Sequence, residues 1–376
     1  MDEVKKYFNE TYLESRAAFR ALSEPVQRCW PQTVQESFAL PAVDEDLTID
    51  MIKALPSGGG KRLLILSCGL HGIEGYSGSA MLQLFASEYL EKLNSAETGL
   101  IMVHSINPWG MQHRRRVNEN NVDLNRNFIY KLAGSRAEVN PAYASIDSFV
   151  NPSTPLRAAA SPFFYLQLGY MIATLGPSRF RENFLLGQYC FPQSLYFGGH
   201  DFEYSARVMK DLFDNAAADY NDLLLIDMHS GYGPRYQMTM VNSRYEQRAS
   251  ADLQEIFNYP LIAKTDPQEF YQMQGDMVDY LYQLVDDRYP AKRFFATSFE
   301  FGTYGESLGA VLRSYRTMVN ENRFYHHGAK NEHVASRVKR DFDNLFIPRE
   351  KEWRKKALQD ARQAFSGILR AEGYSI

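Results

Sequence analysis

Hydrophobic and polar residues along the chain follow two periods, and the shorter period marks the expected strands. Residues 36–41 and 47–55 alternate apolar and polar positions, as strands with one buried face do. The segment "KRLLILSCGL" at 61–70 is almost continuously apolar, which is typical of a strand buried on both faces of a sheet. Further strands are expected at residues 99–107, 222–229, 236–243 and 293–301.

Helical spacing fills the intervals between several of these strands. Apolar positions recur with a helical period from Val4 to Leu22, and Pro25 is expected to end this helix. The same period runs from Tyr76 to Leu93, and residues 349–376 form an amphipathic, charged helical pattern. This alternation of strands and helices predicts an α/β sandwich with the sheet in the middle.

The chain has 376 residues, and we interpret them as a single domain with two additions. A polar, proline-bearing segment from about 130 to 160 is the best candidate for an inserted or mobile region. The prediction is one domain over residues 1–376, with a long insertion at about 130–220 and a C-terminal helical extension at about 329–376.

Composition and charge exclude several classes of partner and compartment. A net charge of -4 and a pI near 6.1 argue against nucleic acid or an anionic membrane as the main partner. Three cysteines without paired spacing fit neither a disulfide framework nor a thiolate metal site. The N-terminus lacks the apolar core of a signal peptide, and the most apolar stretch, residues 162–177, is too short to span a bilayer. We therefore expect a soluble, cytoplasmic protein.

Candidate metal ligands follow two of the expected central strands. His71 and Glu74 come just after the strand at 61–70 and are flanked by glycines, and His229 ends the strand at 222–229. Ligands bind beyond the carboxyl ends of parallel strands, where loops converge. Two imidazoles and one carboxylate, with a fourth position open, are the ligand set of a catalytic Zn²⁺ site. The alternative is that both histidines cap strands and form only local hydrogen bonds.

The segment between these ligands, "NPWGMQHRRRVNENNVDLNRNF" at 107–128, is rich in arginine and asparagine. Arginine is rarely buried unpaired, and a guanidinium group can bind a carboxylate or polarise a carbonyl. In this segment the sequence resembles the zinc metallocarboxypeptidases (carboxypeptidase A-like). That family has, in order, His-x-x-Glu, Asn-Pro-x-Gly, Arg, Asp-x-Asn-Arg-Asn and a strand ending in His-Ser. The matching motifs lie between about residues 63 and 305.

The resemblance implies a three-layer α/β sandwich with a central mixed, twisted β-sheet, and it assigns roles to the motif residues. His71, Glu74 and His229 would hold one Zn²⁺ ion. Asp123 would orient the first zinc histidine, and Arg116 would polarise the scissile carbonyl.

The remaining roles concern the base and the substrate. Glu300, in "ATSFEFGTYG", would be the general base. Asn125 and Arg126 would grip the terminal carboxylate of the substrate. Tyr271 would clamp the substrate, and Val278 would form the floor of the specificity pocket. The nearby Asp276 could instead favour a basic substrate side chain.

The implied function is zinc-dependent hydrolysis of a C-terminal peptide or peptide-like amide bond. Trp109 within "NPWG" and the long stretch from Phe128 to His229 depart from the usual pattern of this family. "FEFG" also resembles the acylase branch of the superfamily, the aspartoacylases and succinylglutamate desuccinylases. An N-acyl amino acid amidohydrolase is therefore the alternative, and a non-catalytic binding protein is a third interpretation. The expected substrate is a peptide or an N-acyl amino acid with a free carboxylate; neither nucleic acid nor a membrane is expected as a partner.

Overall fold

The computed structural model describes residues 3–41, 43–132, 134–157, 162–265 and 273–374. Within them, one sheet contains eight strands in the order β1-β2-β4-β3-β5-β8-β6-β7. The strands are β1 (Thr33–Ala39), β2 (Thr48–Ala54), β3 (Arg62–Cys68), β4 (Thr98–His104), β5 (Asp222–Gly231), β6 (Met238–Asn242), β7 (Ile262–Lys264) and β8 (Arg293–Gly302).

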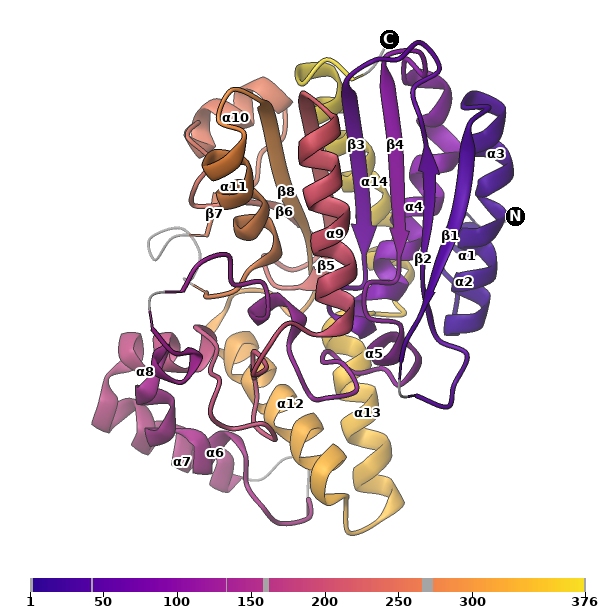
Figure 1. The fold of residues 1–376 in the computed structure, drawn as a ribbon. Coiled ribbons are helices and arrows are strands. Elements are labelled where there is room, and N and C mark those ends of the chain that lie inside the picture. The colour runs from indigo at the N-terminus through magenta and orange to yellow at the C-terminus, as the bar shows by residue number, and fades with distance from the viewer. Residues whose placement is uncertain (1–2, 42, 133, 158–161, 266–272, 375–376) are drawn as a thin grey trace.

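Helices lie on both faces of this sheet and beyond one of its edges (Figure 1). The α-helices are α1 (Glu3–Tyr7), α2 (Tyr12–Ala21), α3 (Ser23–Cys29), α4 (Gly75–Glu88), α5 (Pro108–Gln112), α6 (Asp147–Val150), α7 (Pro162–Leu175), α8 (Pro177–Leu185), α9 (Tyr204–Asp219), α10 (Ser250–Phe257), α11 (Met277–Arg288), α12 (Leu308–His327), α13 (Glu332–Phe346) and α14 (Lys351–Ala371). The short 3-10 helices are η1 (Gly72–Glu74), η2 (Leu90–Lys92), η3 (Leu124–Arg126), η4 (Arg136–Glu138) and η5 (Pro141–Ser145).

The sheet is mixed, and its central strands are parallel. β3 pairs in parallel with both β4 and β5, and β5 pairs in parallel with β8. The strands β1, β2 and β6 add antiparallel neighbours on the two sides. Because four adjacent strands run in the same direction, their carboxyl ends meet at one edge of the sheet, and the loops that leave them share that edge (Figure 1). The predicted three-layer α/β sandwich with a central mixed sheet is confirmed.

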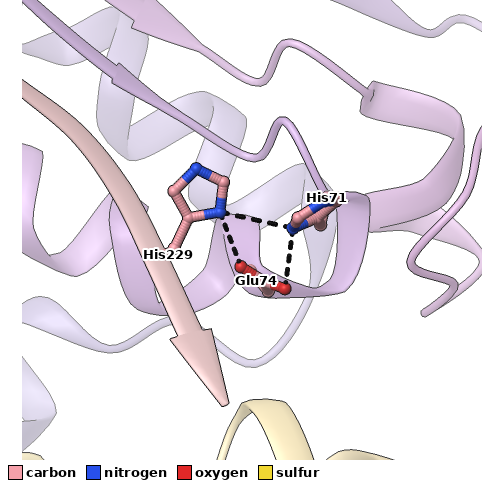
Figure 2. A group of neighbouring side chains, drawn as sticks. All are labelled: His71, Glu74 and His229. Atoms are coloured by element: carbon pink, nitrogen blue, oxygen red, sulfur yellow. Dashed lines mark hydrogen bonds and ion pairs between the residues drawn. The ribbon is translucent and has the colours of Figure 1, made fainter. Parts of the chain in front are cut away.

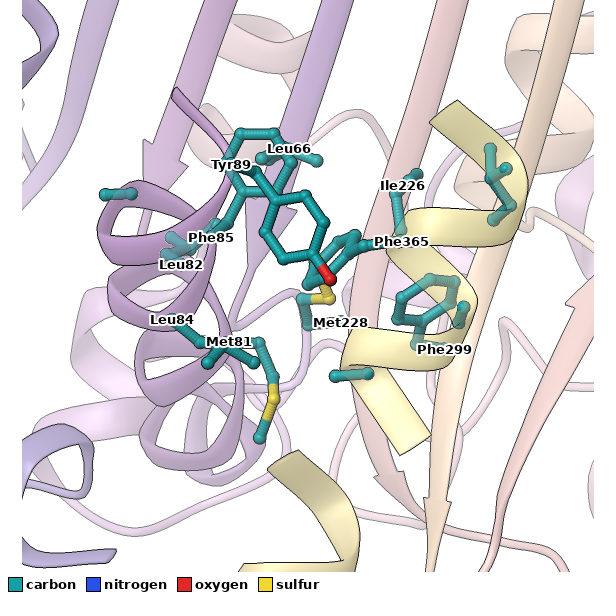
Figure 3. Packing of buried hydrophobic residues seen from close by; sticks show 14 of the residues in the cluster. Leu66, Met81, Leu82, Leu84, Phe85, Tyr89, Ile226, Met228, Phe299 and Phe365 are labelled. Carbon is teal, nitrogen blue, oxygen red and sulfur yellow. The ribbon is translucent and has the colours of Figure 1, made fainter. Parts of the chain in front are cut away.

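Alternate residues of the central strands feed two separate hydrophobic cores, as the period of a strand requires. Leu64 and Leu66 of β3 pack in the core under α4 and α14, whereas Leu63 and Ile65 pack in the core under α9 and α11. Figure 3 shows the first core, where α4 and α14 meet over the sheet. Phe365 of α14 is fully buried there, and complete burial of such a side chain contributes about 1.5–3 kcal/mol.

All seven expected strands are present, and the eighth, β7, was not expected. β7 has only three residues, which is too short for a recognisable period. The single helix expected from Val4 to Leu22 is wrong, because Thr11 forms a capping box with Glu14 and starts a new helix, α2. Pro25 ends no helix either: it lies in the first turn of α3, where a missing N–H breaks no bond.

The predicted insertion contributes to two places in the fold. α9 packs on the sheet through Met209 and Phe213, whereas α6, α7 and α8 lie beyond the carboxyl edge of the sheet (Figure 1). There, Phe180 and Phe184 of α8 share a hydrophobic cluster with Met318 of α12. This places a helical layer next to the loops that follow the central strands. Within the described part of the chain, we find no helix with the length and apolarity needed to cross a bilayer.

Candidate metal and catalytic site

The turn after β3 presents the first two candidate ligands. Gly69 has a left-handed backbone (φ +71°), and a Cβ at Gly72 would lie 2.1 Å from the backbone of Gly110. The chain can therefore turn tightly from His71 into η1, which carries Glu74. The amide of Gly72 donates to the carbonyl of Arg116 at 3.1 Å, so the arginine loop is attached to the same turn.

The third candidate ligand comes from the neighbouring strand. His229 lies near the end of β5, which pairs in parallel with β3. Asp227 precedes it by two residues, so both side chains point to the same side of the sheet. Ser67 of β3 is the register partner of Asp227, and its hydroxyl donates to Asp227 Oδ1 at 2.6 Å.

The three predicted metal ligands converge on one point (Figure 2). His71 Nδ1 lies 3.0 Å from Glu74 Oε1, and His229 Nδ1 lies 3.1 Å from Glu74 Oε2. The two Nδ1 atoms are 3.3 Å apart. All three side chains are at most 4% exposed, and their ligand atoms lie within 4.8 Å of one another. This buried group could hold a metal ion.

Each histidine has a carboxylate behind it. His71 Nε2 lies 3.2 Å from Asp123 Oδ1, and His229 Nε2 lies 2.6 Å from Asp227 Oδ2. A carboxylate on the far nitrogen sets the ring orientation and leaves Nδ1 to face the metal position. Asp123 therefore lies where its predicted role requires. The sequence interpretation missed Asp227, although the Asp-x-His spacing on a strand was a usable signal.

The charges of this group are strongly coupled. Burial alone would raise the pKa of Glu74, but His71 and His229 hold it well below its ordinary value. Burial alone would lower the pKa of His229, but Asp227 and Glu74 raise it well above its ordinary value. The carboxylates thus stabilise a positive charge at the point where the ligands meet.

Arg116 contacts two of the candidate ligands and the carboxylate behind His71. Its Nε donates to Asp123 Oδ2 and its Nη1 donates to Glu74 Oε1, both at 3.1 Å. Its Nη2 also lies 2.7 Å from His71 Nε2. A metal on Nδ1 would leave the ring proton on Nε2, so Nε2 would then donate to Asp123.

Glu300 lies on β8, directly across from His229 in the parallel register. Burial raises the pKa of Glu300 to about 8; His229 and Arg116 lower it, while Glu74 and Asp227 raise it. The carboxyl group therefore needs additional positive charge beside it to be ionised at neutral pH. Glu300 also lines the cavity described below, as a general base should.

The two residues predicted to bind the substrate carboxylate, Asn125 and Arg126, differ in their access to the cavity. Asn125 lines the cavity, and its Nδ2 donates to Asp276 Oδ2 at 2.9 Å. Arg126 is fully buried and is not among the cavity-lining residues. Its Nη2 donates to the carbonyl of Leu185 at 2.6 Å, and its Nη1 donates to the carbonyl of Asn125 at 3.0 Å. In this conformation the Arg126 guanidinium supports the cavity wall.

Two further predicted residues have different outcomes. Tyr271 lies outside the described residues. Val278 is in the first turn of α11 and packs in the sheet core with Phe128. Val278 is absent from the cavity lining, so its expected place at the floor of a specificity pocket is not supported. Asp276 caps α11 by accepting from the amide of Asp279, which gives it a structural role.

A cavity of about 420 Å³ opens beside the candidate ligands. Its polar lining includes His71, Arg116 and Glu300 from the site and Arg181 from α8. Its apolar and aromatic lining comprises Leu185, Tyr196, Tyr232, Met273, Val311, Tyr315, Met318, Leu345 and Phe346. The sequence interpretation assigned no individual role to Arg181 or Tyr196.

The sequence matches the model of a family described as "Protein of unknown function (DUF2817)" over residues 8–360, so the chain belongs to this family. No curated protein matches the sequence.

Several solved structures are similar at low identity. Bovine thrombin-activatable fibrinolysis inhibitor, in complex with tick carboxypeptidase inhibitor, is 15% identical, covers 88% of this chain and 98% of its own, and has a TM-score of 0.46. Carboxypeptidase A from Helicoverpa armigera is 13% identical, with 91% and 75% covered and a TM-score of 0.44. A protein described as a candidate succinylglutamate desuccinylase/aspartoacylase from Shewanella frigidimarina is 14% identical, with 80% and 73% covered and a TM-score of 0.39. At these identities and TM-scores, the functional proposal depends on the side chains of the site.

Proposed function

We propose that this member of the DUF2817 family is a zinc-dependent hydrolase that cleaves a C-terminal peptide or peptide-like amide bond. The observation that carries the proposal is the convergence of His71, Glu74 and His229, with a separate carboxylate behind each imidazole and Glu300 on the same cavity. A purely structural cluster does not require a fourth acid that faces a cavity.

The spacing of the ligands fits zinc. Zn–N and Zn–O bonds of about 2.0–2.1 Å at tetrahedral angles separate neighbouring ligand atoms by about 3.3 Å. The separations among His71, Glu74 and His229 are 3.0, 3.1 and 3.3 Å. Three protein ligands, one of which, His71, lines the cavity, match the arrangement of a catalytic rather than a structural zinc site.

The side chains divide the chemistry among them. A zinc ion bound here would supply a Lewis acid and a water molecule whose pKa is lowered to about 7. Glu300 would take the proton of the attacking water and then pass it to the leaving amine nitrogen. Arg116 lines the same cavity and would donate to the scissile carbonyl oxygen as negative charge develops there. Asp123 and Asp227 would hold the histidine rings in position.

The predicted substrate contacts have unequal support. Asn125 reaches the cavity and can contact a substrate carboxylate there. The role of Arg126 as the main carboxylate receptor stays a prediction, because its Nη groups donate to the carbonyls of Asn125 and Leu185. The role of Tyr271 as a clamp also stays a prediction.

A second candidate is hydrolysis of an N-acyl amino acid. The observation that favours it is the wall that the insertion adds to the cavity through Arg181, Leu185 and Tyr196. Together with α12, these residues leave room for a small substrate beside the ligands. The same three ligands and Glu300 would serve both reactions.

Parallel assays distinguish the two candidates. The protein is stripped of metal, analysed for zinc uptake, and assayed with and without zinc on an N-blocked dipeptide and on N-acetylaspartate. We expect one zinc ion per chain and zinc-dependent hydrolysis of the dipeptide, with weaker hydrolysis of its C-terminal amide. Hydrolysis of N-acyl amino acids alone would transfer the proposal to the second candidate. Stoichiometric zinc without any hydrolysis would contradict both, and would favour a binding protein.

A further inference from the structure

Tyr196 has an unusual backbone conformation next to the candidate site. Its φ is +56°, in the left-handed region, which costs a residue with a Cβ roughly 1–2 kcal/mol. Strained backbone of this kind persists only where its surroundings enforce it, and it clusters at functional sites.

Hydrogen bonds fix the backbone on both sides of Tyr196. The carbonyl of Leu195 accepts from the Tyr143 hydroxyl at 2.9 Å, and the carbonyl of Tyr196 accepts from the amide of Gln188 at 3.1 Å. The carbonyl of Phe197 accepts from the amide of Asp123 at 2.8 Å. The loop that carries Tyr196 is therefore bonded directly to the residue that orients His71.

The ring of Tyr196 lies close to two cations. The guanidinium carbon of Arg116 lies 5.7 Å from the ring centroid, and that of Arg126 lies 5.1 Å from it. Phe184 packs against the ring edge-on, with centroids 5.2 Å apart. The side chain is only 8% exposed, yet it lines the cavity together with His71.

The hydroxyl of Tyr196 has no hydrogen-bond partner among the residues that the structure describes. Burial raises the pKa of this phenol, against the opposing charges of Arg116 and Arg126. The group is thus protonated at neutral pH and can act as a hydrogen-bond donor. A phenol held rigidly at a cavity wall without a protein partner is available for a ligand.

We propose that Tyr196 is a catalytic hydrogen-bond donor that, together with Arg116, stabilises the carbonyl oxygen of the scissile amide as it becomes negatively charged. The role rests on the proposed hydrolase function. The phenol keeps its proton throughout, so the transfer from water to the amine through Glu300 is unchanged. This role differs from the substrate clamp predicted for Tyr271, and Tyr196 belongs to the predicted insertion.

The test is the substitution Tyr196→Phe, which removes one oxygen and keeps the ring beside Arg116 and Arg126. In the zinc-loaded enzyme, on whichever of the two substrates it hydrolyses, we expect kcat to fall about 100-fold, as for the loss of one oxyanion donor. KM should change less than about threefold, and zinc content and Tm should not change. Binding of a phosphonate analogue, whose charged oxygen resembles the oxyanion, should weaken by a similar factor to kcat/KM, while binding of the carboxylate product stays constant.

The matched control is Tyr143→Phe, which removes a hydroxyl that supports the same loop but does not line the cavity. We expect it to lower Tm and to leave kcat within about twofold of the wild type. An equal loss of kcat in both variants, or a loss of zinc that accounts for the lower rate, would overturn the role of Tyr196. An unchanged Tyr196→Phe variant of an active enzyme would also overturn it and leave the proposed function intact. A wild-type protein that hydrolyses neither substrate would overturn the proposed function and this inference together.

Discussion

Asp227→Asn tests whether the carboxylate behind His229 tunes the metal site. Asp227 is fully buried, its Oδ2 lies 2.6 Å from His229 Nε2, and its Oδ1 accepts from Ser67. The amide keeps the size of the side chain and can still accept from Nε2–H, but the negative charge is lost. The ring then becomes a weaker donor of electrons to the metal.

The expected loss follows from this geometry. Replacing a carboxylate that supports a metal-bound histidine lowers metal affinity by about 10- to 100-fold, or about 1.4–2.8 kcal/mol. The magnitude agrees with the net contribution of about 1.5–3 kcal/mol for a hydrogen bond to a charged group. Asp227 also raises the pKa of His229, so in the wild type a proton on His229 would compete with zinc near neutral pH. In Asp227→Asn the proton binds His229 less tightly and competes less with zinc. The loss of zinc affinity relative to the wild type should therefore be smaller at pH 7 than at pH 9.

The assay is a competition titration of metal-free protein with zinc and a chromophoric chelator at both pH values. Asp222→Asn is the matched control, because Asp222 begins the same strand and accepts from the Tyr374 hydroxyl, far from the ligands. We expect the control to bind zinc like the wild type. Wild-type affinity in Asp227→Asn at pH 9 would refute the reasoning, as would an equal loss in both variants.

Three further predictions concern the general base Glu300, the protons released on zinc binding and the backbone at Gly275. Glu300→Gln should still bind one zinc ion per chain but lose about 100- to 10,000-fold in kcat, the range for a general base; near-normal turnover would remove Glu300 from this role. Zinc binding should release protons from His229 and Glu300, because the metal-free pKa of His229 is raised and that of Glu300 is about 8. Apparent zinc affinity should therefore rise with pH and level off above these pKa values. Calorimetry in buffers of different ionisation enthalpy should find fewer protons released by Glu300→Gln than by the wild type, and equal release would contradict this. Gly275→Ala should lower the free energy of unfolding by about 1–3 kcal/mol more than Gly59→Ala. Both glycines have a left-handed backbone (φ +76° at Gly275 and +73° at Gly59), but only a Cβ at Gly275 would clash, because it would lie 2.2 Å from the carbonyl oxygen of Arg126. Equal urea midpoints for the two variants would refute the steric argument.

The candidate ligands could be predicted from the sequence because each belongs to a local pattern. His71 and Glu74 follow a buried strand at helical spacing, and His229 ends another such strand. Parallel strands place their carboxyl ends at a common edge, so residues 158 positions apart could be expected to meet. Asp227 could have been predicted in the same way, because residues two positions apart on a strand point to the same side, as Asp227 and His229 do.

Other features depended on contacts between distant segments, which no local pattern contains. Arg126 matches a substrate-binding motif, yet the helix that ends with Leu185 supplies a carbonyl that holds its guanidinium behind the cavity wall. Val278 has the position of a pocket residue along the chain, but the packing of α11 turns it into the sheet core.

Hydrophobic period and the order of polar residues thus determined the sheet, its polar edge and the candidate metal ligands, because these depend on strand direction and on neighbours along the chain. Only the tertiary structure decided which arginines face the cavity, and that Tyr196 from the insertion lies beside the guanidinium groups of Arg116 and Arg126. The physical reason is that the direction of a side chain at a loop or helix end is set by the packing of segments far away in the sequence.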